Sequence, residues 1–104
     1  YPMAGVISAR AYRTPRLSRF GYITLTAKED QLLLAKGEEI RGHEFHYWES
    51  ESCGEAMRAQ KPLRKRGWDC VHGTASLYAG FPHLFFYSNP DAALRFLEKC
   101  EERL

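Results

Sequence analysis

The residue best suited to move protons in this sequence is His83, which follows the apolar segment 74–81. That segment reads as a strand, and Pro82 must end it because proline lacks the N–H that a central strand needs. His83 is therefore predicted just past a strand end, where its imidazole reaches into a cleft. An imidazole with an ordinary pKa of about 6.5 can accept a thiol proton and pass it to a leaving group. The alternative is a histidine satisfied by backbone groups beneath the last helix.

A second pair of histidines, His43 and His46, lies in the segment Gly42–Tyr47. Their spacing of three suggests a metal site, but side chains on a strand alternate between its faces, so the two point in opposite directions. The alternation places His43, Phe45 and Tyr47 on one face and Glu44, His46 and Trp48 on the other. We therefore expect no metal site here.

The three cysteines, Cys53, Cys70 and Cys100, form no disulfide pattern, which favours a reducing, cytoplasmic setting. None follows a strand and opens a helix, the position that best stabilises a thiolate and an oxyanion. Cys100 falls on the apolar face of the last predicted helix and is expected in the core. The chain is thus predicted to contain no cysteine nucleophile.

The elements that position these residues are read from alternation and turn residues. Strands are predicted at residues 3–8, 20–27, 38–49, 56–60, 68–72 and 74–81, with 20–27 and 38–49 forming an antiparallel pair. Residues 10–19 and 61–67 read as basic loops, the second a hairpin tip. Asn89-Pro90-Asp91 starts a helix. Its apolar face is formed by Ala93, Phe96, Leu97, Cys100 and Leu104.

Charge and hydropathy exclude some partners. The net charge is +2 over 104 residues, which is too small to indicate nucleic acid, and no apolar run approaches the roughly 20 residues of a membrane span. Four arginines recur every third residue at positions 10, 13, 16 and 19. They read as a solvated loop, or alternatively as a surface for a polyanion bearing many carboxylates.

Four segments carry a family resemblance: Met3–Ile7, Arg19–Tyr22, Gly42–Tyr47 and Tyr78–Leu84. Together they resemble the C-terminal part of the cobyrinate a,c-diamide synthase family, ATP-dependent ligases with a triad-type glutamine amidotransferase domain. The resemblance implies an α/β fold. Residues 1–104 would be the C-terminal portion of a class I glutamine amidotransferase-like (flavodoxin-like) domain, with several mostly antiparallel strands and a C-terminal helix. The ATP-binding domain and the cysteine elbow would lie upstream, so the chain is expected to be a fragment.

The resemblance also assigns roles. His83 matches the family's histidine that activates the nucleophilic cysteine as general base and then acts as general acid. Many triad amidotransferases carry a glutamate two residues later, where this chain has Phe85. Glu44 is the candidate to orient His83 instead, and a backbone carbonyl is the alternative. The chain has no glycine-rich phosphate loop, so the ATP and Mg²⁺ site is expected outside it.

The parent function implied is glutamine-dependent amidation of cobyrinate in cobalamin biosynthesis, with glutamine and a corrinoid as substrates. Two alternatives remain open: amidation of another tetrapyrrole such as nickel sirohydrochlorin, and a non-catalytic binding or regulatory module of the same fold. Strands 20–27 and 74–81 are apolar enough to be buried on both faces in the parent. The isolated chain is therefore expected to expose sheet edges and to form a homodimer.

Overall fold

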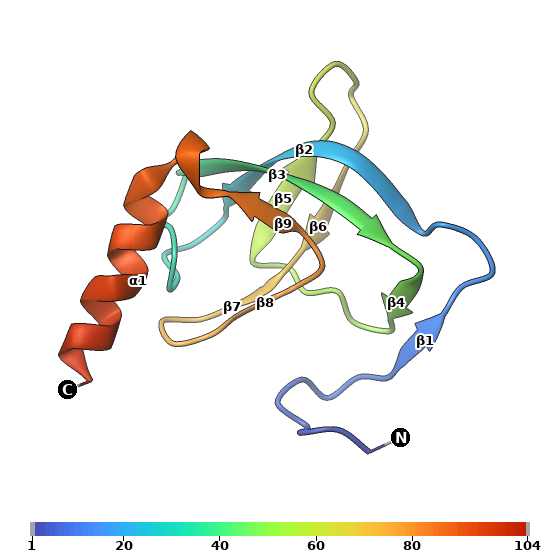
Figure 1. Cartoon of the computed structure of the whole chain (residues 1–104), viewed down its shortest axis with the longest axis horizontal. Helices are drawn as coiled ribbons and strands as arrows, with labels where there is room; N and C mark the ends of the chain where they lie inside the picture. The colour runs from blue at the N-terminus through green and yellow to red at the C-terminus, as the bar shows by residue number, and fades with distance from the viewer. Residues whose placement is uncertain (1, 104) are drawn as a thin grey trace.

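The computed structural model describes residues 2–103 and is built on one five-stranded antiparallel sheet (Figure 1). The strand order is β6-β5-β2-β3-β9. The strands are β2 (Arg19–Ala27), β3 (Glu39–His46), β5 (Met57–Gln60), β6 (Gly67–Cys70) and β9 (His83–Phe85). The helix α1 (Pro90–Glu102) follows at the C-terminal end after the short 3-10 helix η1 (Phe86–Ser88). The expected combination of mostly antiparallel strands and one C-terminal helix is confirmed.

The core lies on one face of this sheet. Residues of β2 alternate between buried and less buried positions, and Ile23, Leu25 and Ala27 are at most 2% exposed. Other core side chains come from the neighbouring strands, the 28–38 connection, the residue between β6 and β7, and the helix: Leu33, Leu34, Ile40, Met57, Ala59, Cys70, Val71 and Ala92. The opposite face of β2 and β3 is open to solvent, since Tyr22 and Phe45 are largely exposed.

The predicted β2–β3 pair is confirmed, with Tyr22 opposite His43. The predicted long strand 38–49 is divided, however. β3 ends at His46, and β4 (Trp48–Ser50) leaves the sheet to pair with β1 (Ala11–Arg13). The prediction that 10–19 is entirely loop is therefore wrong at β1, because three exposed residues there find a partner strand.

The predicted strand 74–81 is wrong over most of its length. Residues 74–77 form a turn in which the Thr74 N–H donates to the Leu77 carbonyl and the Ser76 N–H donates to the Thr74 hydroxyl. This turn joins two short strands, β7 (His72–Gly73) and β8 (Tyr78–Ala79), into a separate ribbon. A threonine hydroxyl that bonds nearby backbone favours a turn over a strand. His83 consequently begins β9 and does not follow a strand end.

The predicted strand at residues 3–8 is also wrong. These residues pair with no strand among residues 2–103, and Met3 and Val6 are 87% and 71% exposed. An extended segment without a partner leaves its backbone groups to water, so apolar composition alone does not make it a strand.

The helix begins where predicted, but it buries a different face. Asn89 does not cap it with its side chain, because the Asn89 amide donates to the Glu39 carbonyl on β3. Ala92 is the helix residue that enters the core, whereas Phe96 and Leu97 are about half exposed. Cys100 is exposed, so its predicted core position is wrong. Leu104 lies outside the described residues. No helix within residues 2–103 has the length and apolar character needed to cross a membrane.

Candidate active site

His83 lies on the open face of the sheet, at the start of the edge strand β9. The ladder between β3 and β9 sets its position, with His43 directly opposite His83 and Gly42 opposite Leu84. The two histidine rings meet with their centroids 4.8 Å apart and their planes tilted by 33°. The ring of His83 has no hydrogen-bond partner among residues 2–103, so its two nitrogens are available to groups from outside this part of the chain.

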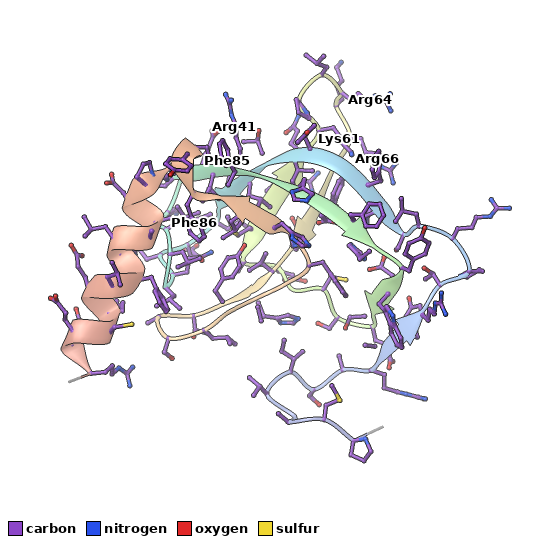
Figure 2. The ribbon with its side chains drawn as sticks, in the orientation of Figure 1. Arg41, Lys61, Arg64, Arg66, Phe85 and Phe86 are labelled. Atoms are coloured by element: carbon purple, nitrogen blue, oxygen red, sulfur yellow. The ribbon has the colours of Figure 1, made fainter. Side chains whose placement is uncertain are left out.

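A groove of about 800 Å³ lies on the same face, lined by apolar and cationic side chains. Its lining includes Tyr22, Arg41, His43, Pro62, Leu84 and Phe85. Arg41 of β3 faces Phe85 of β9 across the ladder. Figure 2 shows these two side chains close to the start of α1, while Lys61, Arg64 and Arg66 project from the β5–β6 hairpin. The predicted basic hairpin tip is confirmed. It contributes Pro62 to the groove, whose charged lining residue is Arg41.

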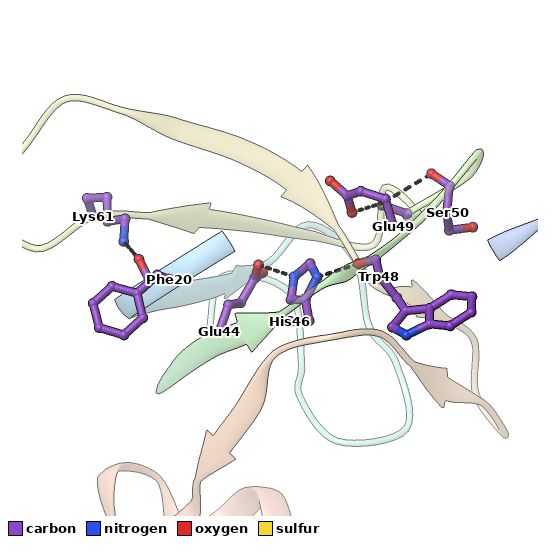
Figure 3. Close-up of polar contacts among 8 residues, drawn as sticks. Phe20, Glu44, His46, Trp48, Glu49, Ser50 and Lys61 are labelled. Carbon is purple, nitrogen blue, oxygen red and sulfur yellow. Dashed lines mark hydrogen bonds and ion pairs between the residues drawn. The ribbon is translucent and has the colours of Figure 1, made fainter. Parts of the chain in front are cut away.

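Glu44 lies on the opposite face of β3 from His83 and is only 3% exposed. Its carboxylate faces the Nε2 atom of His46 at 3.0 Å, as Figure 3 shows. The Nδ1 atom of the same ring donates to the carbonyl of Trp48 at 2.6 Å. The structure therefore brings Glu44 to His46 and does not bring it to His83.

The predicted separation of His43 and His46 onto opposite faces of a strand is confirmed, because residues of β3 alternate strictly between exposed and buried positions from Glu39 to Phe45. Among residues 2–103 no group of three or more histidine, cysteine or acidic side chains is arranged to hold a metal ion. Phe85 lies two residues after His83 on the same exposed face, so that position carries an aromatic ring and no carboxylate.

Within residues 2–103 no hydrogen bond joins His83 to a cysteine thiol, and the three thiols lie in different environments. Cys70 ends β6 in the core, and its burial together with the nearby Glu44 carboxylate raises the pKa of its thiol to about 12. Cys53 lies in the loop between β4 and β5, where burial likewise raises its pKa. Cys100 lies on the exposed side of α1. Protonated, shielded thiols are poor nucleophiles, so neither Cys53 nor Cys70 has the environment of an activated cysteine.

Sequence reasoning missed His43 as the neighbour of His83. The two residues are 40 positions apart, and only the register between β3 and β9 brings them together. Pairs of residues facing each other across strands leave no local signal in a single sequence, so nothing in the chain could have identified this contact.

This arrangement defines an antiparallel sheet that presents a histidine on an open face and has no activated nucleophile beside it among the described residues. The chain is homologous over most of its length to part of the cobyrinate a,c-diamide synthases. The synthase of Caldanaerobacter subterraneus subsp. tengcongensis is 33% identical over 102 residues, which are 96% of this chain and 23% of the relative. That of Fusobacterium nucleatum subsp. nucleatum is 39% identical over 93 residues, or 86% of this chain and 20% of the relative.

A third relative, the cobyrinate a,c-diamide synthase of Picrophilus torridus, is 33% identical over 100 residues, covering 96% of this chain and 21% of its own length. The chain thus spans about a fifth of the length of the curated relatives it matches. No protein-family model matches the chain, and no solved structure gives a significant match.

Proposed function

We propose that this chain is the C-terminal part of the glutamine amidotransferase domain of an ATP-dependent ligase that amidates cobyrinate in cobalamin biosynthesis. The observation that carries the proposal is His83, exposed on an open sheet face with both ring nitrogens free of partners within residues 2–103, in a chain homologous to cobyrinate a,c-diamide synthases. Residues 1–104 would provide one half of a glutaminase site. A segment outside these residues would provide the cysteine.

In this mechanism His83 accepts the proton of the cysteine thiol, and the thiolate attacks the side-chain amide carbon of glutamine. The protonated His83 then gives its proton to the departing nitrogen, which leaves as ammonia while a thioester forms. Water hydrolyses the thioester and releases glutamate. Ammonia attacks a substrate carboxylate that has been activated with ATP. The residues that hold ATP and Mg²⁺ would also lie outside this chain.

The test compares nitrogen sources in the natural polypeptide that contains this chain. His83→Ala should abolish glutamine-dependent amidation of cobyrinate and leave amidation with added ammonia near the parental rate, because free ammonia bypasses the glutaminase step. His72→Asn is the matched control. His72 lies in the β7–β8 ribbon, where its ring bonds the Ser52 carbonyl, and this variant should retain both activities. Equal loss of both activities in His83→Ala would contradict the role given to His83.

A further inference from the structure

His83 follows a connector, Gly80–Pro82, that the backbone alone does not hold in place. Within residues 2–103, no turn or loop hydrogen bond between backbone groups involves these three residues. The connector lies between the β7–β8 ribbon and the edge strand β9, and Pro82 in it has no N–H to donate. Its position, and with it the direction in which β9 starts, must therefore depend on side-chain packing.

The main aromatic contact of this connector is made by His46. The rings of His46 and Phe81 are stacked, with centroids 4.1 Å apart and planes within 13° of parallel. Pro82, the next residue, is buried, and His83 comes directly after it. The ring of His46 thus supports the residue two positions before His83.

His46 can act as a support because both of its nitrogens are fixed. Nδ1 donates to the Trp48 carbonyl at 2.6 Å, and Nε2 faces the Glu44 carboxylate at 3.0 Å (Figure 3). Each ring nitrogen thus has its own polar partner, and the two contacts on opposite sides of the ring fix its orientation. Glu44 is itself buried. The pKa values of Cys70 and Tyr78 are raised, mainly by the burial of these two groups, and the nearby Glu44 carboxylate adds to both shifts.

We infer that Glu44 and His46 are positioning residues for His83: Glu44 orients the His46 ring, and that ring holds Phe81 so that β9 begins with His83 facing the groove side of the sheet. Glu44 and His46 touch neither substrate nor reacting atoms, since they lie on the other face of β3. The inference rests on the proposed function, because its readout is the glutaminase step assigned to His83.

The test measures glutamate release by the natural polypeptide in three variants. His46→Ala removes both the polar contacts and the stack, and kcat should fall about 10- to 100-fold with KM within about twofold, as expected when a proton-transfer group is misplaced. Glu44→Gln keeps the shape of the side chain but loses the charge that fixes the ring, and should lower kcat by a smaller factor. The double variant Glu44→Gln/His46→Phe restores an aromatic ring against Phe81 without leaving a buried charge, and should recover most of the kcat lost in His46→Ala.

Glu39→Gln, at the exposed start of the same strand, is the control and should behave like the parent. Ammonia-dependent amidation should be unchanged in every variant, which shows that each is folded. A kcat within twofold of the parent in His46→Ala, or a double variant no better than His46→Ala, would overturn the inference. His83→Ala is measured in parallel. If it retains glutaminase activity, the proposed function fails. If it loses this activity while His46→Ala keeps it, only the positioning role of His46 and Glu44 fails.

Discussion

Replacing Gly42 with alanine should disturb the register contact that places His83. Gly42 is buried in β3 opposite Leu84, and a Cβ atom there would lie 3.3 Å from the His83 carbonyl carbon and closer still to its oxygen. The neighbour is backbone and cannot rotate away, so β9 must move from β3 by about an ångström to reach an ordinary contact distance. Such a movement weakens the backbone hydrogen bonds of a short three-residue strand.

The expected decrease in the free energy of unfolding follows from this geometry. Losing one or two ladder hydrogen bonds, each worth about 0.5–1.5 kcal/mol, together with overpacking gives a decrease of about 1–3 kcal/mol in the free energy of unfolding. Urea denaturation followed by circular dichroism measures this decrease, and amide hydrogen exchange should show faster exchange in β9 than in β2. A Gly73→Ala variant provides the comparison. The new Cβ there would first meet side-chain atoms, the Ala56 Cβ at 3.0 Å, so a smaller loss is expected.

If the free energy of unfolding of Gly42→Ala falls by less than about 0.5 kcal/mol, and amide hydrogen exchange in β9 is unchanged, the close approach of β3 and β9 is refuted. The placement of His83 opposite His43 would then need revision as well, since the same ladder defines both contacts.

Two further outcomes are expected. Leu25 is fully buried in the core. Leu25→Ala should therefore lower the free energy of unfolding by about 2–5 kcal/mol in the same urea assay. A decrease below about 1 kcal/mol would contradict the position of Leu25 in the core. The pKa of Cys70 is raised to about 12, so its thiol stays protonated as well as buried at pH 8. Iodoacetamide at pH 8 should therefore modify the exposed Cys100 and leave Cys70 unmodified until the protein is unfolded. Peptide mass spectrometry locates the modified cysteines. Equal labelling of both cysteines in the folded protein would contradict the buried position of Cys70.

The elements that could be predicted from sequence are those whose signal is local. Residues 20–27 alternate between the two faces of a strand and are rich in β-branched and aromatic side chains, and Asn89-Pro90 marks a helix start. The sequence therefore predicts β2 and the start of α1 to within a residue or two. Residues 74–81 show the limit of this reasoning. Their apolar character predicted a strand, but the local hydrogen bonds around Thr74 make a turn that composition does not reveal.

The candidate site was predictable in part. The alternation that separates His43 from His46 follows from strand geometry alone. The same alternation places Glu44 and His46 on one face, so their contact was within reach of the sequence. The position of His83 on the other face depends on the β3–β9 register, and the contact of His46 with Phe81 depends on the path of a connector without regular structure. A single sequence encodes neither of these two contacts locally.

In the proposed function, His83 serves a nucleophilic cysteine supplied from outside these 104 residues. The most direct measurement labels the natural polypeptide with a chloroketone analogue of glutamine and locates the modified cysteine by peptide mass spectrometry. We expect a label on a cysteine outside this chain, and we expect the labelling to be lost or strongly slowed in His83→Ala. A label on Cys53, Cys70 or Cys100, or labelling that proceeds unchanged without His83, would contradict it.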